Sequence, residues 1–144
     1  MEFMETNVGS RRLRELGRLL LYGSCIEVEW PEHLKALSAG RFAASVCMER
    51  EHYNMVGYKL ACAVRASSLR EVVALTVDGS PHCVQLHTLV EEVRKLIGGF
   101  EALHYVIYKG KLYRVEAEDV KLSRYLSKVA RLTRGPSLSS QLSP

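Results

Sequence analysis

The stretch Val72-Val-Ala-Leu-Thr-Val-Asp-Gly-Ser-Pro-His-Cys83 decides the fold of this chain. Its first half is a β-branched, apolar run that is typical of a buried strand, and Asp78-Gly-Ser-Pro81 ends that strand. Apolar residues at helical spacing follow over residues 82–97, and two glycines come next. A buried strand that leads directly into an amphipathic helix is the repeating unit of a parallel α/β sheet.

The residues before this stretch repeat the same alternation. Apolar runs at residues 19–23 and 42–48 predict two more core strands, and residues 54–66 predict a helix between the second and third strands. Residues 26–30 alternate apolar side chains with glutamates, which predicts a half-exposed strand. Such alternation indicates parallel βαβ units with right-handed crossovers.

The C-terminal third has a different pattern. Residues 104–108 and 111–115 alternate around Lys109-Gly110, which predicts a β-hairpin at one edge of the sheet, and residues 117–132 predict a last helix. The expected fold is therefore α/β: a small, mostly parallel sheet in a three-layer arrangement, with helices on both faces and a C-terminal β-hairpin and helix.

The length of 144 residues suits one domain with its own core. We expect a flexible N-terminus over residues 1–10, a single α/β domain over 11–134, and a disordered, Ser-rich tail over 135–144. No apolar run approaches the ~20 residues of a membrane span, and the N-terminus lacks the features of a signal peptide. These features predict a cytoplasmic protein without a membrane segment.

Positive charge is concentrated near the C-terminus, although the net charge is only +4. Eight Lys or Arg residues lie between positions 109 and 134, against three acidic residues. A basic end of this kind suits an acidic partner, a nucleic acid or a cofactor phosphate. The tyrosines of the hairpin lie beside basic residues, but half-buried packing explains them more simply than nucleic-acid stacking.

Three of the four cysteines come at or after the ends of predicted strands. Cys25, Cys47 and Cys83 follow the first, second and third core strands, whereas Cys62 lies inside a predicted helix as a small core residue. Functional groups of parallel sheets gather past the carboxyl ends of the strands. We therefore expect these three thiols to meet at one edge of the sheet.

Cys83 has the most specific local context. It falls in the first turn of a predicted helix, where backbone N–H groups and the helix dipole would lower the pKa of its thiol. His82 is adjacent and His87 lies one helical turn further on, so either imidazole is a candidate base. Asp78 could orient an imidazole or cap the helix.

These residues are compatible with three interpretations. In the first, Cys25, Cys47 and Cys83 bind an iron–sulfur cluster or a zinc ion, with His82 or His87 as fourth ligand. In the second, Cys83 is a catalytic or redox thiol with His87 or His82 as base. In the third, all of them are ordinary buried residues. No CxxC pair, GxGxxG motif or Walker loop is present to decide among these interpretations.

Two segments carry a resemblance: Ala44-Ser-Val-Cys47-Met-Glu-Arg50, and Ala74-Leu-Thr-Val-Asp-Gly-Ser-Pro-His-Cys83-Val-Gln-Leu-His87. They resemble the strand-end cysteine and the Gly–Pro/Cys–His loop of the small iron–sulfur (delta-type) subunits that accompany archaeal hydrogenases and heterodisulfide reductases. The resemblance implies electron transfer in a larger complex, with Cys47 and Cys83 as ligands and Cys25 as a candidate third. Unlike that family, this chain lacks paired N-terminal cysteines, and it has Asp78 near the place of a further cysteine.

The sequence thus predicts a component or accessory of a larger redox complex, or a homo-oligomer, with a Cys/His metal or iron–sulfur site. A thiol-dependent enzyme built on Cys83 is one alternative. A non-catalytic interaction module that docks through its basic C-terminal helix is the other, so the sequence leaves open whether the protein is an enzyme.

Overall fold

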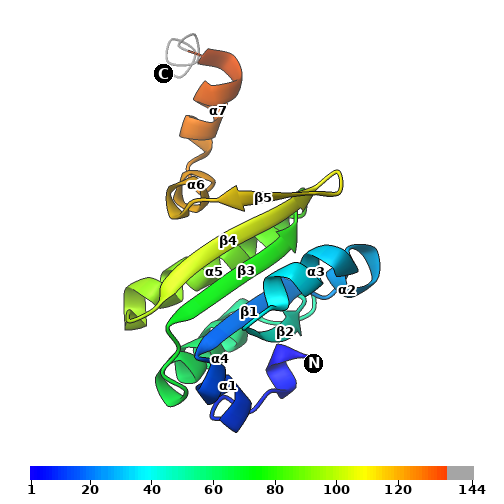
Figure 1. The fold of residues 1–144 in the computed structure, drawn as a ribbon. Coiled ribbons are helices and arrows are strands. Elements are labelled where there is room, and N and C mark those ends of the chain that lie inside the picture. Colours follow the sequence, from blue (N-terminus) through cyan, green and yellow to red (C-terminus); the bar gives the residue numbers. More distant parts are fainter. Residues whose placement is uncertain (136–144) are drawn as a thin grey trace.

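The computed structural model describes residues 1–135, and its centre is a five-stranded sheet in the order β2-β1-β3-β4-β5 (Figure 1). The strands are β1 (Arg18–Gly23), β2 (Phe42–Val46), β3 (Glu71–Val77), β4 (Glu101–Tyr108) and β5 (Lys111–Val115). The first four are parallel, and only β5 is antiparallel to its neighbour. Leu21 of β1 pairs with Ala44 of β2 and with Ala74 of β3, so these three strands end at one edge of the sheet.

Helices cover both faces of the sheet. The helical elements are η1 (Phe3–Glu5), α1 (Arg11–Leu16), α2 (Ile26–Glu29), α3 (Pro31–Ser38), α4 (Tyr53–Ala66), α5 (Pro81–Ile97), α6 (Ala117–Leu122) and α7 (Leu126–Arg134). Leu19 and Leu21 point into a core shared with α1, α4 and α5, whereas Leu20 and Tyr22 point into a second core with α2 and α3. This alternation follows from the two-residue period of a strand. The predicted three-layer α/β fold is confirmed.

The segment after β1 differs from its predicted conformation. Residues 26–29 form helix α2 instead of a half-exposed strand, and the N–H of Trp30 donates to the carbonyl of Ile26 at 2.9 Å. Ile26 is buried while Val28 is 86% exposed, although a strand would place both side chains on one face. The chain has already passed the end of β1 here, so its backbone polar groups are satisfied within a helical turn.

Residues 1–10 also differ from the expected flexible N-terminus. Phe3 is fully buried, the amide of Ser45 donates to the carbonyl of Met1 at 2.8 Å, and Lys59 donates to the carbonyl of Met4 at 2.7 Å. β2 is an edge strand, and this segment covers its free side.

The predicted β-hairpin in the C-terminal part is confirmed, because residues 104–108 of β4 pair antiparallel with residues 111–115 of β5 at one edge of the sheet. Lys109 and Gly110 have φ of 50° and 78°, as the two-residue hairpin loop between β4 and β5 requires. However, β4 is a fourth parallel strand, because residues 98–100 return the chain from α5 to the same edge at which β3 begins. The predicted single last helix is divided into α6 and α7, and α7 projects away from the sheet (Figure 1). Except for Gly135, the predicted tail over 135–144 lies outside the described residues. Over residues 1–135, no helix has the length and apolar character needed to cross a bilayer.

Candidate functional site

A cavity of about 290 Å³ lies at the carboxyl ends of β1, β2 and β3. Its lining comes from four places: the turn after β1, the loop after β2, the end of β3 and the first turns of α5. The connection after β1 leads to α2 and α3 on one face of the sheet, whereas α4 and α5 pack on the other face. The cavity therefore lies where the strand order reverses between β1 and β3, which is the usual ligand position in open α/β sheets.

The three predicted cysteine ligands and His82 line this cavity, which we call the thiol cavity, whereas the alternative ligand His87 does not. Cys25 follows β1, Cys47 follows β2, and His82 and Cys83 belong to the first turn of α5. All of these cysteines are free thiols. The gathering of three remote cysteines at one edge is thus confirmed. Cys62 lies apart from them, half-buried on α4 beside a shallow surface depression that Met4 also lines, so it is not the core residue expected.

The pKa of the Cys83 thiol is raised, which contradicts the sequence-based expectation of a lowered value. Burial is the largest cause, and the nearby Cys47 and Asp78 add to it, while hydrogen bonds with Ser80 and the Val77 backbone act in the opposite direction. Burial likewise raises the pKa of Cys25, with Cys83 and Cys47 contributing further. The neighbouring thiols are therefore close enough to disfavour ionisation of Cys25 and Cys83, and the cavity favours the neutral form of these two thiols unless a cation compensates.

His87 does not lie at the thiol cavity as the predicted base for Cys83. It is only 5% exposed, with Nε2 at 2.7 Å from Oγ1 of Thr76 and Nδ1 at 2.9 Å from Nδ1 of His104. Burial, with the neighbouring His104, lowers the pKa of His87 to about 3. Since both ring nitrogens already have partners, His87 is not available to accept a proton from Cys83, and the thiol-enzyme interpretation loses this base.

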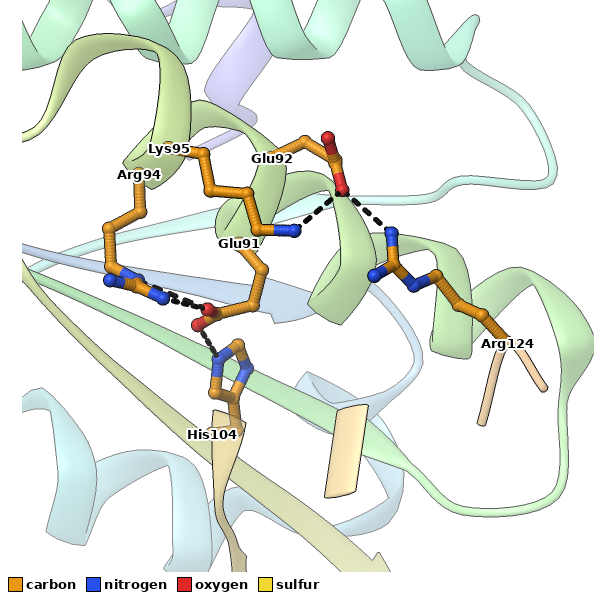
Figure 2. A network of polar contacts seen from close by, with 6 residues as sticks. All are labelled: Glu91, Glu92, Arg94, Lys95, His104 and Arg124. Atoms are coloured by element: carbon orange, nitrogen blue, oxygen red, sulfur yellow. Dashed lines mark hydrogen bonds and ion pairs between the residues drawn. The ribbon is translucent and has the colours of Figure 1, made fainter. Parts of the chain in front are cut away.

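Sequence reasoning missed the partners of His87. His104 lies on β4 and is 1% exposed. Its Nε2 is 2.7 Å from Oε2 of Glu91, which is a buried residue of α5. Figure 2 shows this contact and the paired hydrogen bonds from Arg94 to the other oxygen of Glu91. One signal was present: His87 and Glu91 are four residues apart on the face of α5 that carries Leu86 and Val90. Polar residues at such positions indicate a buried pair.

The thiols have the donor chemistry of a soft-metal site without forming a preassembled one. Thiolate and imidazole are the ligands that zinc and iron–sulfur clusters take in proteins. Within residues 1–135, however, no group of three or more His, Cys, Asp or Glu side chains is arranged to hold a metal ion. Metal binding at the thiol cavity would require these side chains to move toward one another.

The parallel sheet and the cavity at its strand-order reversal define a class of protein, the α/β domains with a ligand site at the carboxyl ends of the strands. The chain belongs to the Rossmann-like domain family, whose model matches residues 12–138. No curated protein and no solved structure shows significant similarity to it.

Proposed function

We propose that this domain is a small component of a larger redox complex and that the thiol cavity holds a thiophilic metal centre, either zinc or an iron–sulfur cluster. Cys25, Cys47 and Cys83 would be the ligands, with His82 as the nitrogen donor on the same wall. The proposal rests on one observation: three cysteines from three separate strand ends line a single cavity at the reversal of strand order.

A buried hydroxyl gives independent support for an occupant. Ser24 lines the thiol cavity, and its Oγ is the only buried side-chain oxygen or nitrogen within residues 1–135 that has no hydrogen-bond partner. Leaving such a group unsatisfied costs about 1–3 kcal/mol. An occupant with a hydrogen-bonding atom, such as a cluster sulfide as acceptor or a metal-bound water as donor, would satisfy this hydroxyl.

The electrostatics of the thiols also favour a cation. Cys25 and Cys83 each have a raised pKa, partly because neighbouring thiols would repel a second negative charge. A bound cation reverses this effect, since it stabilises all of the thiolates together. The same reasoning predicts that metal binding releases protons and becomes stronger as the pH rises.

Metal content tests the proposal directly. After anaerobic purification of the full chain, or reconstitution with iron and sulfide or with zinc, we expect one centre per chain in the wild type. Cys47→Ser and Cys83→Ser should reduce bound metal to background, because each removes a ligand from the cavity wall. Cys62→Ser is the matched control and should retain the full content. A metal-free wild type, or an equal loss in Cys62→Ser, would contradict the proposal.

A second candidate function is suggested by α7, which has no buried residue. Leu126 and Leu132 are 79% and 73% exposed, and by the helical period they lie with Val129 along one side of the helix. Arg131 lies on the opposite side, and Lys128 lies at the boundary between the two sides. An exposed helix with an apolar side and a basic side is suited to a groove with acidic edges. We propose that α7 docks this domain onto an acidic partner protein of the same complex.

Leu126→Asp combined with Leu132→Asp should leave the domain's stability within about 0.5 kcal/mol of wild type, because both side chains are exposed. Thermal denaturation measures this stability.

A photo-crosslinking residue at position 132 should capture one acidic protein in cells, and Lys128→Glu with Arg131→Glu should abolish that product. Lys35→Glu on α3 is the control and should leave the product unchanged. Crosslinks confined to a second copy of the chain would indicate a homo-oligomer and contradict the proposal.

A further inference from the structure

Four buried polar side chains form an unbroken hydrogen-bonded chain through the domain, from Thr76 on β3 to Glu91 on α5. The successive contacts are Thr76 Oγ1 to His87 Nε2 at 2.7 Å, His87 Nδ1 to His104 Nδ1 at 2.9 Å, and His104 Nε2 to Glu91 Oε2 at 2.7 Å. All four residues are at most 6% exposed. Two adjoining imidazoles in a core need a specific reason, because buried polar groups are costly unless they are fully paired.

The two ends of the chain reach different cavities. Thr76 lines the thiol cavity. Glu91 and Arg94 line a second cavity, of about 190 Å³, between α5 and α6. Figure 2 shows this end, where the Glu91 carboxylate is hydrogen-bonded to Arg94 and His104. Glu92 forms separate ion pairs with Lys95 and Arg124. The hydrogen-bonded chain therefore connects the thiol cavity with the second cavity, which lies between α5 and α6.

In the neutral state, one arrangement of hydrogens satisfies every contact. His104 donates from Nε2 to the Glu91 carboxylate, so its Nδ1 is an acceptor. His87 must then donate from Nδ1 to His104, which leaves its Nε2 as the acceptor for the hydroxyl of Thr76. All three hydrogen bonds point from the thiol cavity toward Glu91.

Adding one proton gives a second arrangement that is equally complete. When His104 is an imidazolium, both of its nitrogens donate, one to Glu91 and one to His87. His87 remains neutral but becomes the other tautomer, so that Nε2 donates to Thr76. The Thr76 hydroxyl then accepts from His87, and its own hydrogen is free to donate into the thiol cavity.

We propose that this chain is a one-proton relay that links the protonation of the His104–Glu91 pair to the hydrogen-bonding character of Thr76 in the thiol cavity. A protic group in the cavity, such as water or a thiol, loses its proton and becomes hydroxide or thiolate, while a new O–H bond forms on Thr76. The previous hydroxyl proton passes to Nε2 of His87, and the Nδ1 proton of His87 passes to Nδ1 of His104. One positive charge moves from the cavity to His104, and no electrons are transferred.

The charged surroundings of the chain keep that charge at one end. The charged group in contact with the imidazoles is Glu91 of α5, which contacts His104 and is itself paired with Arg94 of the same helix. β3 contributes the hydroxyl of Thr76. Burial strongly lowers the pKa of His87, so His87 changes tautomer without becoming charged itself. Nε2 of His104 contacts the Glu91 carboxylate, so a positive charge on this ring would lie beside a group of opposite sign.

The relay makes the hydrogen-bonding preference of the thiol cavity depend on pH. In the protonated state Thr76 offers a hydrogen-bond donor to the cavity, and in the neutral state it offers only acceptor lone pairs. An anionic occupant and the relay proton therefore strengthen each other's binding, as thermodynamic linkage requires. This inference does not depend on the metal centre proposed above, since any anionic group in the cavity would be subject to it.

Nitrogen-15 NMR of the full chain, labelled at histidine, tests the relay without any ligand. On acidification we expect His104 to gain a proton at Nδ1 while His87 changes from the Nδ1–H to the Nε2–H tautomer at the same midpoint. In Glu91→Gln, both transitions should move together to lower pH by about one unit, a tenfold loss of proton affinity, because the compensating carboxylate charge is gone. A His87 that keeps its Nδ1 proton, or that titrates separately from His104, would overturn the relay.

The link to the thiol cavity needs its own measurement. The backbone amide signals of Ser24 and Cys47 should follow the histidine midpoint in the wild type. In Thr76→Val the histidine transition should persist, but these two amides should lose their response. Thr88→Val is the control: it removes a hydroxyl from α5, the helix of His87 and Glu91, at a position outside the hydrogen-bonded chain, and it should behave as wild type. If the Thr76→Val amides still respond, or the wild-type amides never do, the relay does not serve the cavity.

Discussion

Replacement of Glu91 by alanine is expected to lower the free energy of unfolding by about 2–4 kcal/mol, measured by urea denaturation at neutral pH. The Glu91 carboxylate is buried and accepts hydrogen bonds from both His104 and Arg94. These bonds outweigh burial, which by itself would raise the pKa of Glu91, so the net effect is a lowered pKa and an ionised group. Removing it leaves His104 buried without its acceptor, and that loss is the main cost.

Glu92 is the matched control, because it is the next residue on α5 and also forms two ion pairs, with Lys95 at 3.5 Å and Arg124 at 3.0 Å. Its side chain is 40% exposed, against 8% for Glu91, so solvent screens its interactions. Glu92→Ala should therefore cost no more than about 1 kcal/mol. Equal losses in the two variants would show that the Glu91 contacts contribute no more than surface ion pairs.

The second large effect concerns acid stability and His87. Its pKa is about 3 in the folded state, against the ordinary value of 6.5. Between these values the unfolded chain binds a proton at His87 and the folded chain does not, so acid favours unfolding. The stabilisation is fully present above pH 6.5 and is lost as the pH falls toward about 3. The slope for one proton is about 1.4 kcal/mol per pH unit.

Replacing His87 by asparagine should remove that slope. The variant will be less stable at neutral pH, because the Thr76 and His104 contacts change, but its stability should fall less steeply below pH 6.5 by one proton's contribution. Denaturant titrations at pH 7, 6, 5 and 4 measure this slope. His82→Gln, at the thiol cavity, is the control and should keep the wild-type slope. An unchanged slope in His87→Asn would mean that His87 is protonated equally in both states.

The elements with strong local signals could be predicted from the sequence. The β-branched run at 72–77 buries its side chains as a strand, and the apolar rows of α4 and α5 bury theirs as helices. The Lys109-Gly110 turn requires positive φ at both residues, as a two-residue hairpin loop does. The gathering of Cys25, Cys47 and Cys83 was also predictable, because parallel strands place all their carboxyl ends at one edge. That inference needed only the order of elements along the chain.

Other features depended on contacts between segments that are distant in sequence. The N-terminal residues are ordered because β2 leaves an open edge, and β4 is parallel because the chain returns beside β3. Residues 26–29 form a helix because they lie beyond the end of the sheet. Local patterns contain no information about such neighbours.

The pKa of Cys83 and the contacts of His87 show most clearly what the sequence determined and what the tertiary structure decided. The sequence by itself determined that Cys83 would begin a helix, but tertiary burial decided that its pKa rises. The sequence placed His87 on α5, while only the packing of α5 against β3 and β4 brought it to Thr76 and His104. Hydrogen-bond direction, burial and charge depend on distances of a few ångströms between separate elements. The tertiary structure alone fixes those distances.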